Sequence, residues 1–154
     1  MKKVFYLILL LTLCQVGQIN AHKFEKTSLG GIYEVNGVDI EVQFYTPSIV
    51  RIIKAPKGRA YEKKSLSVIA NPQQVIFTSH KSGKNIRLES DQLRIIIDQC
   101  SGVVSFYTKK GKKLLLEKSA AIFTDFNDAG MKTFSVYQPF ILETGEAIYG
   151  LGQL

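Results

Sequence analysis

Tryptophan is absent from this 154-residue sequence, and cysteine and histidine occur only twice each. The scattered histidines, His22 and His80, show no metal-ligand spacing and no pairing with a cysteine of the kind that nucleophilic catalysis uses. The sequence also has no phosphate-binding loop of the form GxxxxGK(S/T) and no GxSxG nucleophile elbow. It therefore predicts no metal site, no cofactor site and no catalytic residue within this chain.

No apolar run reaches the roughly 20 residues that a membrane-spanning helix needs. A run of apolar residues and threonine over 4–14 follows a positively charged start and leads into a polar stretch that ends at Ala21. This order is typical of a secretory signal, whose apolar part needs only about 7–15 residues. We predict a signal peptide over 1–21 and an exported chain, periplasmic or extracellular, that meets a membrane only through this segment. Lipid anchoring at Cys14 is less favoured, because Leu13 stands where a lipoprotein signal has a small residue.

Removal of the signal would leave one domain of ordinary size over 22–154, with the net charge reduced from +7 to +5 because two lysines leave. Cys100 would then be the only cysteine, so export does not imply a disulfide-bonded scaffold. The residues around it, from Asp98 to Gly102, predict a passive turn between two strands.

From Phe24 onward the sequence is typical of an all-β protein. Apolar and polar residues alternate from 39 to 44, which places Ile40, Val42 and Phe44 on one face of a strand. Turn residues recur about every 8–12 positions, the spacing of an antiparallel β-sandwich or barrel, and Asn36-Gly37 is a hairpin signal. The expected strands cover residues 31–35, 39–44, 49–54, 75–79, 86–88, 93–98, 103–108, 114–116 and 134–142.

Two clusters of basic residues could bind nucleic acid or a membrane surface. In an exported β protein they are more simply solvated hairpin tips that keep sheet edges from pairing, so we expect no nucleic-acid partner. The basic residues are Lys109, Lys110, Lys112 and Lys113 around Gly111, and Arg51, Lys54, Lys57 and Arg59 around Pro56.

Residues 125–130 resemble a calcium loop only loosely, lack its terminal glutamate and are expected to form an ordinary loop.

Paired carboxylates can act together as a general acid and a nucleophile. Asp39 and Glu41 share a strand face but alternate with apolar residues, which predicts the solvent face of a half-buried strand. Glu143 and Glu146 flank a predicted turn. Neither pair has an environment that would separate two pKa values into an acid and a nucleophile. The aromatic residues are spread over many strands and are expected to lie mostly in the core: Tyr33, Phe44, Tyr45, Phe77, Phe106, Tyr107 and Phe126.

The C-terminal end carries a more specific pattern. Residues 146–152, Glu-Ala-Ile-Tyr-Gly-Leu-Gly, follow the apolar stretch 138–143. This pattern resembles a stretch near the end of the N-terminal β-sandwich of glycoside hydrolase family 31, the α-glucosidases and α-xylosidases. Three further segments are similar to the same domain in the same order, and the resemblance covers about residues 31–154. These segments are 44–52, 65–72, and 101–107 continuing to 111–117.

The resemblance implies a galactose-mutarotase-like antiparallel β-sandwich at the front of an exported, retaining α-glycosidase acting on α-linked glucose or xylose. In that family a following (β/α)₈ barrel supplies two aspartates, a nucleophile with a tryptophan two residues before it and an acid/base, about 5–5.5 Å apart in a retaining enzyme. This chain has no tryptophan, so none of its aspartates takes either role. We expect an N-terminal domain that is incomplete at its C-terminal end, with an open edge and an exposed apolar patch. Carbohydrate would then be bound through the catalytic domain.

Two other readings remain open. A free-standing exported β-sandwich could hold glycans by aromatic stacking, although tryptophan, the best stacking platform, is missing. It could also be an exported structural domain without a ligand.

Overall fold

The structure is a computed structural model that describes residues 24–59 and 68–146. These residues form twelve strands and no helix, so none of them belongs to a helix that could cross a membrane. The predicted signal peptide lies outside the described residues. The strands are β1 (Phe24–Lys26), β2 (Gly30–Val35), β3 (Val38–Thr46), β4 (Ile49–Pro56), β5 (Thr78–Ser82), β6 (Asn85–Glu89), β7 (Leu93–Asp98), β8 (Val104–Thr108), β9 (Lys113–Glu117), β10 (Ile122–Asp128), β11 (Met131–Tyr137) and β12 (Phe140–Ile141).

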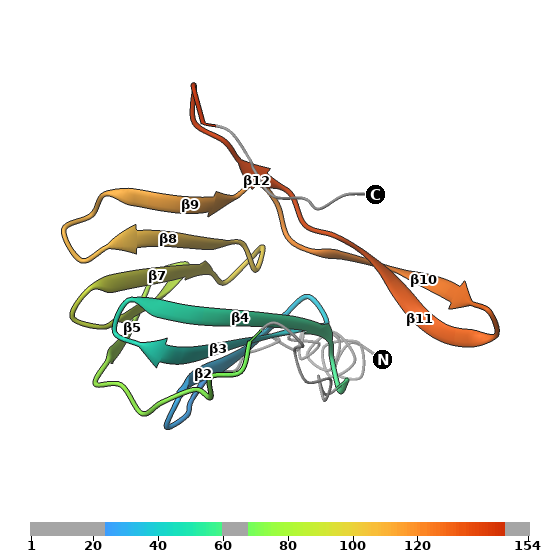
Figure 1. The fold of residues 1–154 in the computed structure, drawn as a ribbon, viewed down its shortest axis with the longest axis horizontal. Coiled ribbons are helices and arrows are strands. Elements are labelled where there is room, and N and C mark those ends of the chain that lie inside the picture. Colours follow the sequence, from blue (N-terminus) through green and yellow to red (C-terminus); the bar gives the residue numbers. More distant parts are fainter. Residues whose placement is uncertain (1–23, 60–67, 147–154) are drawn as a thin grey trace, which may run out of the picture.

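Two antiparallel sheets form a sandwich, as the sequence predicts. One sheet has the strand order β1-β2-β3-β4, and the other has the order β12-β9-β8-β7-β6-β5. Except for β9 and β12, neighbouring strands of each sheet follow one another along the chain. Tight turns join several of them, such as Asn36-Gly37, where both residues have positive φ. Strands β10 and β11 form a separate hairpin that pairs with no other strand of the described residues and projects away from the sandwich, as Figure 1 shows.

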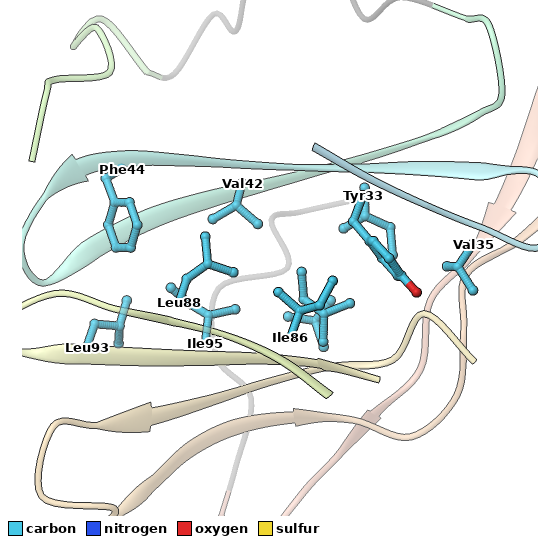
Figure 2. Packing of buried hydrophobic residues seen from close by; sticks show 11 residues of the cluster. Tyr33, Val35, Val42, Phe44, Ile86, Leu88, Leu93 and Ile95 are labelled. Carbon is cyan, nitrogen blue, oxygen red and sulfur yellow. The ribbon is translucent and has the colours of Figure 1, made fainter. Parts of the chain in front are cut away.

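The core lies between the two sheets. Alternate residues of β2 and β3 point toward alternate residues of β6, β7 and β8, and all are almost completely buried (Figure 2). Phe44 is fully buried, and its ring centroid lies 5.3 Å from that of Phe77. The core residues are Tyr33, Val35, Ile40, Val42, Phe44, Ile86, Leu88, Leu93, Ile95, Ile97 and Val104.

Three of the sequence-based assignments differ from the structure. Residues 125–128, expected to be a loop, belong to strand β10, and the turn is confined to Ala129 and Gly130. Phe126, expected in the core, is 53% exposed on this strand. The strand expected over 75–79 begins only at Thr78, because Val75 and Phe77 pack against the core without pairing with a neighbouring strand. Strand β1, which has only three residues, is not among the strands predicted from the sequence.

Tyr33 joins the sheets through its polar end. Its hydroxyl donates a hydrogen bond of 3.0 Å to the carbonyl of Gln99 while its ring is fully buried. Burial, reinforced by the nearby Cys100 and Asp98, raises the pKa of Tyr33 to about 12. The hydroxyl therefore stays protonated as a donor throughout the physiological range.

Gly102 is a position where the core requires glycine. Its φ is +74°, and a Cβ built on it would lie 2.5 Å from Cγ1 of Val35 and 3.2 Å from Cδ1 of Ile40. We expect Gly102→Ala to lower the free energy of unfolding by about 2–3 kcal/mol, from backbone strain and overpacking together. Gly83 has a φ of +55° with nothing near its missing Cβ, so Gly83→Ala should show only the smaller strain. Urea unfolding of both variants checks the difference, and equal losses would contradict the role of the core contact.

Asp98 organises the turn that carries Cys100. Its Oδ1 accepts hydrogen bonds from the hydroxyl of Ser101 at 2.8 Å, the N–H of Ser101 at 2.7 Å and the N–H of Cys100 at 3.0 Å. These donors, the Ser101 hydroxyl first, hold the pKa of Asp98 below its ordinary value against the opposing effect of burial. The turn is therefore structural, as expected, with Cys100 an exposed free thiol.

This lowered pKa predicts an acid-dependent loss of stability. Ionised Asp98 stabilises the fold at pH values above its ordinary pKa of about 3.9, and that contribution is lost as the pH falls through the lower folded-state pKa. Ser101→Ala removes one donor, so the pKa of Asp98 should rise and the loss should begin at higher pH. Urea unfolding between about pH 5 and pH 2 tests this, with Ser119→Ala, an exposed serine in another loop, as the control. Unchanged pH dependence in the Ser101 variant would contradict the assignment.

Candidate functional site

An open apolar groove lies beside the core. It has a volume of about 530 Å³. One wall is the edge strand β4, the floor is the inner side of β8, β9 and β12, and the third side is the stem of the β10–β11 hairpin. The lining residues are Ser48, Ile49, Val50, Ile52, Lys54, Leu93, Phe106, Leu114, Leu115, Glu117, Ala121, Phe123, Val136, Gln138 and Phe140.

The groove is open because the two sheets differ in width. Among the described residues, the four-stranded sheet ends at β4, which pairs with β3 on one side, whereas the other sheet continues past β8 to β9 and β12. Ile49, Leu114 and Phe140 are consequently 44–56% exposed although they lie at inner or rim positions. The exposed apolar patch and the open edge expected from the sequence are thus both present in the described part of the chain.

A buried ion pair lies in the lining of the groove. Nζ of Lys54 on β4 lies 2.6 Å from Oε2 of Glu117 on β9, and the two side chains are only 10% and 5% exposed. Glu117 Oε2 also accepts the N–H of Val104 at 2.7 Å, and Lys54 donates to Oε1 of Gln138 at 3.2 Å. The pair therefore links both sheets to the segment that leads from the hairpin into β12.

This arrangement does not provide acid–base chemistry. A retaining glycosidase needs two carboxyl groups facing one sugar, about 5–5.5 Å apart. The groove has a single carboxylate, that of Glu117, which is neutralised by Lys54 and held by a backbone N–H. Within residues 24–59 and 68–146, no group of three or more His, Cys, Asp or Glu side chains could hold a metal ion. The groove is suited to packing against apolar side chains.

The carboxylates singled out in the sequence lie elsewhere and have structural contacts. Asp39 accepts a hydrogen bond of 3.2 Å from the N–H of Gly58, and Glu41 accepts one of 2.7 Å from the side chain of Gln43. Glu146 accepts the N–H of Glu143 at 2.9 Å across the predicted turn. None of these four carboxylates lines the groove.

Most residues of the basic clusters are exposed, whereas Arg51 and Lys54 are partly buried. Lys57 pairs with Glu34 at the surface, and Arg59 stacks over the ring of Phe134 at 5.6 Å. Lys54, expected on a solvated tip, instead points into the groove. The alternation of Val50, Ile52 and Lys54 along β4 could have indicated this inward position, but nothing in the sequence identifies Glu117, 63 residues away, as its partner.

The chain is similar to known glycoside hydrolases. The family model of the glycosyl hydrolase 31 N-terminal galactose mutarotase-like domain matches residues 39–153. An α-xylosidase of Saccharolobus solfataricus is 28% identical over 120 residues, which cover 77% of this chain and 16% of that protein. α-Glucosidase 2 of Bacillus thermoamyloliquefaciens is 26% identical over 106 residues, 68% of this chain and 14% of that protein.

A solved structure agrees with the sequence matches. The crystal structure of the family 31 α-xylosidase from Xanthomonas citri superimposes with a TM-score of 0.69 at 26% identity, covering 77% of this chain and 13% of that one. The present chain thus spans less than a fifth of each relative. The family match extends over most of its length and agrees with the sandwich described above. The chain belongs to the family of glycosyl hydrolase 31 N-terminal galactose mutarotase-like domains.

Proposed function

We propose that this chain is the N-terminal, non-catalytic domain of an exported retaining α-glycosidase that acts on α-linked glucose or xylose in oligo- or polysaccharides. The observation that carries the proposal is the family match over residues 39–153 in a chain that spans only 13–16% of its relatives. Two of those relatives are named as α-xylosidases and one as an α-glucosidase. Export is supported by the signal-like composition of residues 1–21.

The chemistry of the described residues favours a structural role over a catalytic one. Their one groove carboxylate, Glu117, is buried in an ion pair, and the groove around it is mainly apolar. Apolar surface of this kind is typical of a face that packs against other protein. In this proposal, carbohydrate reaches the enzyme through the catalytic domain, and the sandwich stabilises that domain.

The isolated 154-residue chain tests the non-catalytic role. Incubated with 4-nitrophenyl α-glucoside and α-xyloside, it should release no 4-nitrophenol above the buffer blank, while a known α-glucosidase provides the positive control. Turnover that survives repeated purification would refute the proposal. Calorimetric titration with malto- and xylo-oligosaccharides should likewise show no saturable heat. Saturable heat would instead favour a free-standing carbohydrate-binding module.

A further inference from the structure

The turn between β8 and β9 concentrates positive charge. Four exposed lysines lie within residues 109–113, which we call the lysine turn: Lys109, Lys110, Lys112 and Lys113. Within residues 24–59 and 68–146, no carboxylate forms an ion pair with the first three. Nζ of Lys113 lies 3.8 Å from Oε1 of Glu143, and the two side chains are 62% and 67% exposed. Like charges held this close together repel one another, so an anion that lies among them is favoured.

The lysine turn has a fixed backbone. The N–H of Gly111 donates to the carbonyl of Thr108 at 2.9 Å, and the N–H of Thr108 donates to the carbonyl of Lys112 at 2.8 Å. The N–H of Lys109 donates to the carbonyl of Gln92, in the neighbouring turn between β6 and β7, also at 2.8 Å. The positions from which the lysines extend are therefore set before any ligand arrives, and binding has to order only their side chains.

A row of side chains on the outer face of the sheet extends the positive surface. Strand register aligns Arg94 of β7, Tyr107 of β8 and Lys113 of β9. This row faces away from the core, because Ile95, the neighbour of Arg94, points into it. Nη2 of Arg94 donates to the carbonyl of Lys109 at 3.3 Å, which ties the row to the lysine turn. An aromatic ring thus lies between basic residues on both neighbouring strands.

The carboxylate nearest to this row in the strand register, that of Glu89, senses the surrounding charge. Its Oε1 lies 2.5 Å from Nε of Arg94, and the hydrogen bond from Arg94 is the first cause of its lowered pKa. The charges of Lys109 and Arg87 act in the same direction, against the effect of burial. Basic side chains outnumber carboxylates here two to one, with Glu89, Asp91 and Glu143 counted against Arg87, Arg94 and the four lysines. The face is therefore positive overall.

We propose that the lysine turn and the row beside it bind an acidic polysaccharide, a glycan that carries carboxylate or sulfate groups. The lysines pair with the anionic groups, and the ring of Tyr107 packs against the apolar face of a sugar. The choice of a glycan over nucleic acid or a membrane rests on the proposed function, since an exported polysaccharide-degrading enzyme meets glycans. The lysine turn lies at the opposite end of the molecule from the tip of the β10–β11 hairpin (Figure 1). The bound glycan anchors the enzyme and lies apart from the groove.

Affinity electrophoresis of the protein made from the complete reading frame tests this inference. The probe is polygalacturonate, a carboxylated polysaccharide, cast into the gel, and uncharged dextran is cast into a reference gel. The protein should be retarded by polygalacturonate and not by dextran, and added salt should weaken the retardation. K109Q/K110Q/K112Q should lower the affinity for polygalacturonate about tenfold, because three exposed charge contacts are lost together.

A matched variant separates this surface from the net charge of the protein. K81Q/K84Q/K132Q removes three exposed lysines that lie outside the lysine turn and should leave the affinity unchanged. The inference is overturned if polygalacturonate does not retard the protein or if both triple variants lose affinity equally. Tighter binding of duplex DNA or of anionic lipid vesicles than of polygalacturonate would also overturn it. Absence of α-glycosidase activity in a protein that binds polygalacturonate through the lysine turn would refute the proposed function alone.

Discussion

Replacing Lys54 with methionine is expected to lower the free energy of unfolding by about 3–5 kcal/mol, because it leaves the buried Glu117 carboxylate without its counter-charge. Methionine keeps the length and apolar stem of lysine, so the loss arises from the missing ammonium group. Among the described residues, the N–H of Val104 would be the remaining donor to Glu117, whose side chain is only 5% exposed. The link between the two sheets and Gln138 would also be lost.

The double variant K54M/E117Q separates the ion pair from its surroundings. Glutamine is uncharged and keeps an acceptor for the N–H of Val104, so most of the lost stability should return. Lys57→Met removes an exposed partner of Glu34 and should have little effect. Urea unfolding of the three variants provides the comparison. Exposed ion pairs contribute up to about 1 kcal/mol to the free energy of unfolding. A decrease smaller than this for Lys54→Met would contradict the claim that the fold depends on the buried pair.

Phe44→Ala is expected to cost about 3–5 kcal/mol, because it opens a cavity at the centre of the sandwich. The ring is fully buried on β3, stacks against Phe77, and points toward the opposite sheet at the end of the core near Leu93, as Figure 2 shows. The chain offers a matched control in Phe126→Ala, which truncates a half-exposed phenylalanine of the hairpin. In thermal unfolding, Phe44→Ala should lower the Tm much more than Phe126→Ala. Similar decreases in Tm for the two variants would mean that Phe44 is not a core residue.

The core could be predicted from the sequence because its strands alternate regularly. Ile40, Val42 and Phe44 on β3 follow the two-residue period and are buried as expected. The predicted strand over 93–98 is β7, where Leu93, Ile95 and Ile97 are buried with the same period. The hairpin turn at Asn36-Gly37 follows equally from local conformational preference. These features depend on residues that are close in the sequence, so local reasoning is sufficient for them.

The features that local reasoning missed depend on distant pairing. Strand β10 contains Thr124, Asp125, Asn127 and Asp128, a composition typical of loops, and is a strand because β11 pairs with it along seven positions. The Lys54–Glu117 pair joins strands from different sheets. The groove itself arises from the unequal width of the sheets, a property of topology rather than of any one segment. The sequence could supply only the general expectation of an open apolar edge.

Hydrolysis of aryl α-glycosides by the protein made from the complete reading frame tests the central claim most directly. The product anomers are followed by NMR with 4-nitrophenyl α-xyloside and α-glucoside as substrates. We predict turnover of at least one substrate, with the α-anomer of the free sugar formed first, as retention requires. A folded complete protein that hydrolyses neither substrate, or that forms the β-anomer first, would contradict the assignment of this chain to a retaining α-glycosidase.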